Sequence, residues 1–197
     1  MESLSAGQHV QEQRRLTLAA ARGQVLEIGF GTGLNFAHYP ASVVHVTAID
    51  RERMQPRKVQ GRVAAAPVPI KAVCLDASGR LPFEDNYFDT VVTTWTLCPI
   101  ADVGAALAEI GRVLKRNGFY LFLEHGRSED TRLARRQDLL SPVVRVIGSG
   151  CRMNRKIDQV ISSAGLEIVA LDRFRMPDTP RILGEIYRGV ARSLSLR

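Results

Sequence analysis

The chain has 197 residues, of which 45% are hydrophobic and 24% are charged. This length and composition suit one globular domain with a sizeable core, and they exclude a disordered, collagen-like or coiled-coil protein. The formal net charge is +7, and the excess lies in the last third of the chain, because residues 127–197 hold 14 basic and 8 acidic side chains.

Short apolar runs alternate with amphipathic stretches, which predicts an α/β fold. We expect a Rossmann-like, doubly wound and mostly parallel sheet of about seven strands, with helices on both faces. Strands are predicted at residues 25–28, 43–49, 70–75, 88–94, 119–123 and 166–174. Residues 182–191 fit a helix or a strand, and we favour an antiparallel edge strand. Helices are predicted at residues 9–21, 35–39, 51–60, 102–114, 131–147 and 155–164.

Three local signals refine these boundaries. Asp102 precedes a clear helical pattern and suits the N-cap position, where its carboxylate can accept a backbone N–H. Asn117-Gly118 is a turn signal before the fifth strand. Pro56 is tolerated in a helix only near the first turn, so the helix predicted at 51–60 is the weakest of the set.

The segment VLEIGFGTG, residues 25–33, is the strongest motif. A strand runs into three glycines at alternate positions, which lets the backbone pass close to a ligand. The segment matches neither the G-x-G-x-x-G fingerprint of a dinucleotide site nor the Gly-Lys-Ser/Thr ending of a phosphate-binding loop. Glu27, two residues before the first glycine, would repel a phosphate but suits an ammonium group. The loop therefore favours the amino-acid part of a ligand over a pyrophosphate.

Acidic residues follow the next two strands. Asp50 comes 21 residues after Gly29, where a carboxylate can accept both hydroxyls of a ribose. Asp76 follows the third strand and can accept a hydrogen bond from an adenine amino group, with Ala77 leaving room beside it. Because ligands of open α/β sheets bind at the carboxyl ends of the strands, these residues predict a nucleoside site next to the glycine loop.

Together these motifs resemble those of class I S-adenosylmethionine-dependent methyltransferases. The glycine loop, Asp50, Asp76, LPFEDNYFDTVV and ALAEIGRVLKRNGFYLFLEH follow one another over residues 22–126 as in the methyltransferase type 11 domain, in the branch that includes ubiquinone and menaquinone methyltransferases. A closer resemblance, to the methyltransferase-like thiol methyltransferases of animals and their bacterial relatives, is carried by GTGLNFAHYP, TLCPI, EH and GCRMNR. The animal proteins begin with an apolar membrane anchor, which we do not expect here because the first 15 residues are mostly polar. Phe30 also replaces their small residue or cysteine between the first two glycines.

The resemblance implies a single methyltransferase domain over residues 1–197, with a cofactor-binding core at 22–126 and substrate-side elements at 127–197. It implies S-adenosylmethionine as the cofactor, with Glu27 facing the methionine ammonium and residues 94–98 opening into the substrate pocket. The implied cofactor-binding residues are Glu27, Gly29, Phe30, Gly31, Gly33, Asn35, Asp50, Arg51, Asp76, Ala77, Thr94, Trp95 and Cys98.

His125 is the candidate catalytic residue, because it ends the fifth strand at the edge where such sites lie and its ordinary pKa suits a general base. The sulfonium of the cofactor already activates the methyl group, so the protein mainly orients the reactants. A thiol nucleophile needs little help from a base. We expect a small or lipophilic acceptor, whose nucleophile is a thiol, a quinol-type carbon or a phospholipid amine.

Two other functions stay open. One is a non-catalytic protein that binds S-adenosylmethionine or a nucleotide. The other is an RNA methyltransferase, suggested by the basic residues 127–197. Nucleic acid is the less favoured partner, because Thr-Trp-Thr-Leu follows the fourth strand where amino-methylating nucleic-acid enzymes usually carry an Asn/Asp-Pro-Pro-Tyr/Phe motif.

The cysteines at 74, 98 and 151 lie far apart without a CxxC pair, so we expect no zinc ribbon, no redox dithiol and no metal. Scattered thiols and a polar N-terminal segment favour the cytoplasm. Residues 127–197 predict a solvated basic face, which can also contact an anionic membrane surface peripherally. The oligomeric state stays open.

Overall fold

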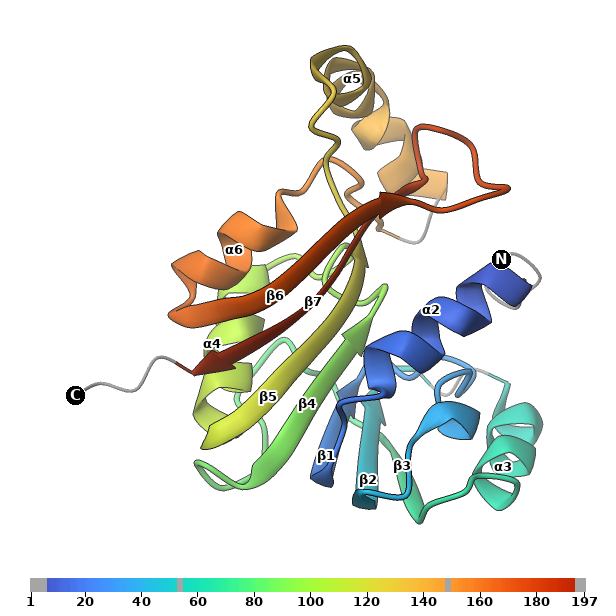
Figure 1. Ribbon diagram of the computed structural model, residues 1–197, viewed down its shortest axis with the longest axis vertical. Coiled ribbons are helices and arrows are strands. Elements are labelled where there is room, and N and C mark those ends of the chain that lie inside the picture. Colours follow the sequence, from blue (N-terminus) through green and yellow to red (C-terminus); the bar gives the residue numbers. More distant parts are fainter. Residues whose placement is uncertain (1–6, 53–54, 148–149, 194–197) are drawn as a thin grey trace.

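The computed structural model describes residues 7–52, 55–147 and 150–193. Its centre is one seven-stranded sheet with the order β3-β2-β1-β4-β5-β7-β6 (Figure 1). The strands are β1 Gly23–Ile28, β2 Val43–Asp50, β3 Ile70–Cys74, β4 Phe88–Thr94, β5 Leu114–His125, β6 Leu166–Arg175 and β7 Glu185–Ser193. The helices are α2 Gln8–Leu18, α3 Pro56–Ala64, α4 Val103–Val113, α5 Thr131–Ile147 and α6 Ile157–Ser163, with a 3-10 turn, η1, at Phe36–His38.

Strands β1 to β5 are mutually parallel, and β7 runs antiparallel between β5 and β6. The strand order reverses between β1 and β4, and the crevice at the carboxyl ends of such strands is where open α/β sheets bind ligands. The predicted Rossmann-like, mostly parallel fold is confirmed. Residues 182–191 were predicted to form an antiparallel edge strand, and β7 there is antiparallel but is not the edge. It pairs with both β5 and β6, so β6 is the edge strand, and its apolar residues Ile186, Tyr187 and Ala191 are buried.

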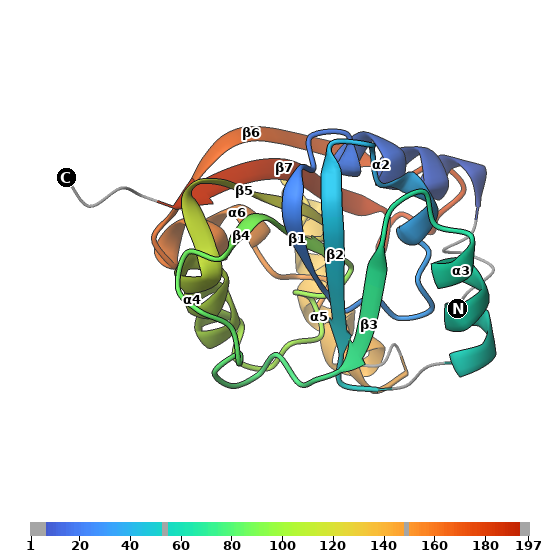
Figure 2. The same ribbon diagram turned by 90° about the horizontal axis from the view of Figure 1, so that it is seen from below.

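Helices cover both faces of the sheet, as predicted, and each layer closes its own core (Figure 2). One core joins α4 and α6 to the sheet through Leu107, Ile110, Ile157 and Ile161. The other joins α2, η1 and α3 to the opposite face through Leu18, Phe36 and Val59. Both cores pack against the central strands of the sheet, so these strands are buried on both faces.

Most predicted boundaries hold, and α5 matches its predicted range. Asp102 caps α4 as expected, since its Oδ1 accepts a hydrogen bond from the Ala105 N–H at 2.9 Å. The helix predicted at 51–60 begins only at Pro56, because the missing N–H of proline suits the first helical position. Asn117-Gly118 is not a turn but lies within β5, where the pairing with β4 shifts and the extra residues are accommodated as a bulge.

Helix α5 stands clear of the sheet beyond the end of β5 (Figure 1). Across the described ranges, no helix combines the length and the apolar character needed to cross a membrane. The predicted domain limits at residues 1 and 197 lie outside the described residues, and the division into core and substrate-side elements at 126–127 stays a prediction.

Candidate functional site

The glycine loop follows β1 at the point where the strand order reverses. Gly29, Gly31 and Gly33 have φ values of +76°, +54° and +81°, a backbone region that side chains with a Cβ rarely adopt. A Cβ at Gly29 would collide with Thr96, and one at Gly33 would collide with the Phe36 ring, whereas one at Gly31 would meet nothing within 4 Å. The backbone at Gly31 is therefore open to a ligand, which fits the predicted cradle.

Glu27 lies beneath this loop and is 1% exposed. Its Oε1 accepts a hydrogen bond from Asn35 Nδ2 at 2.9 Å, and its Oε2 accepts one from the Tyr39 hydroxyl at 2.7 Å. Burial raises the pKa of Glu27, and these two hydrogen bonds oppose that shift. The carboxylate thus anchors the loop to η1, and its predicted contact with a methionine ammonium stays a prediction.

The side chains of Phe30 and Asn35, which were predicted to contact the cofactor, are both engaged by other side chains of the protein. The Phe30 ring is buried beside the Phe36 ring at 5.9 Å, so this side chain belongs to the core and only its backbone lies in the loop. The Asn35 side chain is fully buried and is engaged by Arg14, Glu27 and Thr94. We infer that Asn35 holds the glycine loop in place from its buried side, because both polar atoms of its side-chain amide already form hydrogen bonds within the protein.

Arg14 on α2 completes this network, although the sequence analysis did not single it out. Its Nη1 donates to Asn35 Oδ1 at 2.7 Å and to Thr94 Oγ1 at 3.1 Å. Burial lowers the pKa of Arg14 to about 10, so the guanidinium stays charged at neutral pH. A signal for it was present, since Arg14 shares the buried face of α2 with Thr17 and Leu18 at helical spacing.

Arg14 and Trp95 each hold an N–H group that lacks a partner. The Arg14 Nε and the Trp95 Nε1 are both buried and form no hydrogen bond among the described residues. Burying an unpaired donor is costly, so such groups indicate a ligand acceptor. Their position beside Thr94, at the end of β4, fits the carboxylate of the methionine part of S-adenosylmethionine.

The residues predicted to contact the nucleoside lie at the ends of the adjacent strands β2 and β3. Asp50 Oδ2 accepts the Gly31 N–H at 2.8 Å, which ties the end of β2 to the loop, while Asp50 stays half-exposed. Asp76 is exposed after β3, and its hydrogen bonds with Ser78 lower its pKa. Arg51 pairs with Glu52 at the surface, and Ala77 packs at the rim of the core. The structure thus gathers these predicted residues at one edge.

The region where β4 and β5 finish is named the acceptor end here, after the substrate pocket predicted at residues 94–98. Trp95 has a φ of +52°, and its ring lies 6.0 Å from the His125 ring. Glu124 Oε1 accepts the N–H groups of Thr96 and Leu97, each at 3.0 Å, and burial raises the pKa of Glu124 to about 7. Glu124 therefore shapes the turn after β4 and does not orient its neighbour His125.

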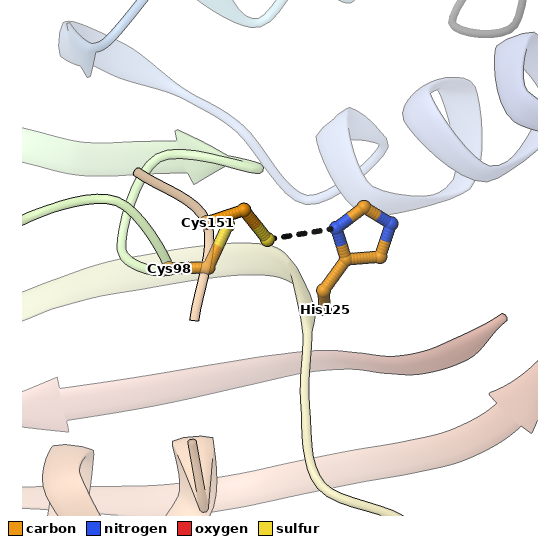
Figure 3. Close-up of side chains that lie close together, drawn as sticks. All are labelled: Cys98, His125 and Cys151. Carbon is orange, nitrogen blue, oxygen red and sulfur yellow. Dashed lines mark hydrogen bonds between the residues drawn. The ribbon is translucent and has the colours of Figure 1, made fainter. Parts of the chain in front are cut away.

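Cys98 and His125 are joined here by Cys151, which lies in the GCRMNR motif but was not among the predicted site residues. Cys151 Sγ lies 3.9 Å from His125 Nδ1, and the three side chains converge from three segments (Figure 3). A hydrogen bond from the Cys98 thiol and the nearby His125 ring lower the pKa of Cys151, while the same pairing and burial raise that of Cys98. Only the fold brings Cys151 to this place, since it lies 53 residues from Cys98 in the chain.

Residues 26–122 match the family described as a methyltransferase domain. The chain is 28% identical to the thiol S-methyltransferase TMT1B of Rattus norvegicus, over 83% of this chain and 70% of that protein. It is 28% identical to a phosphatidylethanolamine N-methyltransferase of Cereibacter sphaeroides, over 84% of this chain and 82% of the relative. It is 33% identical to the ubiquinone/menaquinone biosynthesis C-methyltransferase UbiE of Burkholderia mallei, over 63% and 53% respectively.

Solved structures show the same fold at low sequence identity. A putative methyltransferase of Bacillus halodurans has a TM-score of 0.70 and 17% identity, covering 92% of this chain and 95% of that one. The 1,6-didemethyltoxoflavin-N1-methyltransferase of Burkholderia thailandensis, solved with S-adenosylhomocysteine bound, has a TM-score of 0.72 and 15% identity, covering 98% and 82%. The family match and the named relatives show that residues 26–122 form an S-adenosylmethionine-dependent methyltransferase domain, and the solved structures show its fold.

Proposed function

We propose that this protein transfers a methyl group from S-adenosylmethionine to the sulfur of a small or lipophilic thiol. The charge of the acceptor end carries this proposal. The described side chains there are neutral or basic apart from the Glu124 carboxylate, which is fully buried and holds the turn after β4. Such surroundings favour a thiolate, whereas an ammonium acceptor finds no accessible carboxylate among the described residues there.

Arg155 supplies the positive charge at this end. Its Nη1 donates to the Leu97 carbonyl and its Nη2 donates to the Ile100 carbonyl at 3.0 Å, so the guanidinium is held against the turn that carries Cys98. It acts electrostatically on both Cys98 and Cys151. A half-buried cation at this place lowers the free energy of an anionic acceptor more than that of a neutral one.

Several residues would hold the cofactor. The open backbone at Gly31, with Asp50 and Asp76 beside it, suits the nucleoside, and the unpaired N–H groups of Arg14 and Trp95 suit the carboxylate. The bound cofactor supplies an electrophilic methyl group. The chain itself orients the acceptor, keeps water out and favours loss of the thiol proton, and orientation alone is worth on the order of 7–11 kcal/mol.

The likeness to known proteins supports a thiol acceptor and names a phospholipid amine as the acceptor to compare with it. Similarity to a thiol S-methyltransferase covers 83% of the chain, and similarity to a quinone methyltransferase covers 63%. The phosphatidylethanolamine methyltransferase covers as much as the thiol enzyme, so a phospholipid amine is the acceptor to test beside it.

A panel assay with labelled S-adenosylmethionine tests the proposal. The purified protein is given an alkyl thiol, an aromatic thiol, phosphatidylethanolamine vesicles, a quinol and RNA. We expect turnover with a thiol, and we expect Arg155→Gln to lower kcat/KM for that thiol about tenfold while S-adenosylhomocysteine affinity is retained. Turnover only with the phospholipid, the quinol or RNA contradicts the proposal, and tight cofactor binding with no turnover indicates a non-catalytic binding protein.

A further inference from the structure

Three side chains at the acceptor end form a set of soft donor atoms. Cys98 comes from the turn after β4, His125 is the last residue of β5, and Cys151 lies in the segment between α5 and α6. Their Sγ, imidazole nitrogen and Sγ atoms all lie within 4.8 Å of one another (Figure 3). We propose that Cys98, His125 and Cys151 bind a zinc ion, which replaces the expectation from sequence that the protein has no metal site.

The spacing of the donor atoms suits zinc. With Zn–S near 2.3 Å and Zn–N near 2.0–2.1 Å, tetrahedral coordination places two sulfurs about 3.8 Å apart and a sulfur and a nitrogen about 3.6 Å apart. The Cys151 Sγ to His125 Nδ1 distance of 3.9 Å is already close to that value. No pair of donor atoms exceeds 4.8 Å, so shifts of about 1 Å or less in the side chains complete the geometry.

The backbone around the two cysteines is held in place by other contacts. The Arg152 N–H donates to the Cys98 carbonyl at 3.1 Å, and the Arg152 side chain donates to the Ala101 carbonyl at 3.1 Å. Arg155 binds two further carbonyls of the same turn. These contacts pin the segment that carries Cys151 to the turn that carries Cys98, so the donors stay assembled without needing a disulfide.

Thiolate and imidazole together select zinc among common divalent ions, because carboxylate and carbonyl oxygens are preferred by magnesium and calcium. The two sulfurs could instead form a disulfide between Cys98 and Cys151. That disulfide would give no role to His125 Nδ1, which contacts the Cys151 sulfur. In the proposed zinc site, His125 acts as a metal ligand and no longer as the predicted general base.

The described residues provide three ligands, and three protein ligands with one open position are typical of catalytic zinc. If the proposed function holds, the open position takes the acceptor sulfur. The thiol gives its proton to solvent as it coordinates, and the sulfur then forms a bond to the methyl carbon. The methyl–sulfonium bond breaks with its electron pair left on the cofactor sulfur, and the neutral thioether leaves the zinc.

Metal analysis of the purified full chain, kept reduced, tests the site directly. We expect about one zinc per chain after exposure to micromolar zinc, and substitution by cobalt(II) should give sulfur-to-metal charge-transfer absorption. Cys151→Ser and His125→Ala should each lower zinc affinity at least tenfold. Cys74→Ser is the matched control, because Cys74 is exposed and lies outside the cluster. Wild-type protein that takes up no zinc, or a Cys151→Ser variant that binds it as well as wild type, overturns the proposal.

Two further measurements separate this site from the proposed function. Binding of S-adenosylhomocysteine to each variant shows that the fold and cofactor site are intact, and it should change less than threefold. Addition of an acceptor thiol should shift the charge-transfer band of the cobalt protein. Zinc binding without thiol turnover contradicts the proposed function alone. Equal thiol turnover before and after removal of zinc contradicts the role of the metal alone.

Discussion

The Arg14 guanidinium lies over the Trp95 ring with its carbon 4.7 Å from the ring centroid, which joins helix α2 to the turn after β4. Each side chain also has a buried N–H group without a partner among the described residues. The cation–π contact holds both side chains in place before a ligand binds, so little conformational entropy of these side chains is lost on binding.

We expect Arg14→Gln to weaken binding of S-adenosylhomocysteine by about 10- to 100-fold, because a hydrogen bond to a charged group is worth about 1.5–3 kcal/mol. Isothermal titration measures this change. Binding of 5′-methylthioadenosine, which lacks the amino-acid carboxylate, should change much less. Arg15→Gln serves as the control, since Arg15 is exposed and pairs with Glu12. Equal losses for the two ligands would mean that Arg14 only supports the fold.

The second prediction concerns Gly31, whose added Cβ would meet no protein atom. Gly31→Ala should cost about 1–2 kcal/mol of stability, because φ is +54°, and it should weaken cofactor binding more than tenfold by filling the cradle. Gly61→Ala is matched to it, since a Cβ there also meets nothing, but Gly61 lies within α3, where alanine is favoured. Denaturant unfolding and titration separate the two effects. Unchanged affinity in Gly31→Ala would place the ligand elsewhere.

The third prediction concerns the ion pair of Glu109 and Arg112 on α4. Two Arg112 nitrogens donate to the two carboxylate oxygens at 2.8 and 2.7 Å, and they lower the pKa of Glu109 to about 2. A lowered carboxyl pKa stabilises the fold above the unfolded value near 4.5, and this contribution is lost as pH falls toward 2.

At pH 7, Glu109→Gln should therefore lower the free energy of unfolding by about 1–2 kcal/mol, less than the full pKa shift implies because solvent screens a partly exposed pair. The difference from wild type should shrink between pH 4.5 and 2 in denaturant unfolding curves. Glu167→Gln, which breaks the exposed pair with Arg192, should change stability by less than about 0.5 kcal/mol. A constant difference across this pH range would refute the assignment.

The fourth prediction refines the expected membrane contact of the basic last third. Helix α5 exposes apolar side chains at helical spacing, with Leu139 77% and Val146 80% exposed, and it carries several arginines. Such a helix binds an anionic lipid surface through apolar burial and charge together. Vesicle co-sedimentation should fall several-fold for Leu139→Glu with anionic lipid, and Val44→Glu, an exposed apolar site on β2, should leave it unchanged. Equal loss in both variants would argue against α5.

The central strands, the glycine loop and the acidic residues after β2 and β3 could be predicted from the sequence, because each of these signals lies within one short segment of the chain. Apolar runs and helical spacing predicted the strands and helices, and glycines at alternate positions after a strand predicted a cradle whose backbone angles only glycine adopts readily. Asp50 and Asp76 lie at the carboxyl ends of the adjacent parallel strands β2 and β3, as predicted, and their contacts with a cofactor stay predictions.

The arrangement of side chains at the acceptor end could not be predicted from the sequence, because it depends on contacts between segments far apart in the chain. Only the tertiary structure shows these contacts. The packing of α2 on the sheet buries Arg14 beside Trp95, although 81 residues separate them. Hydrogen bonds between the segment at 150–155 and the turn after β4 bring Cys151 to Cys98 and His125. Contacts of this kind leave no periodic pattern in the sequence, because they result from the packing of whole helices and strands and not from the order of residues within one element.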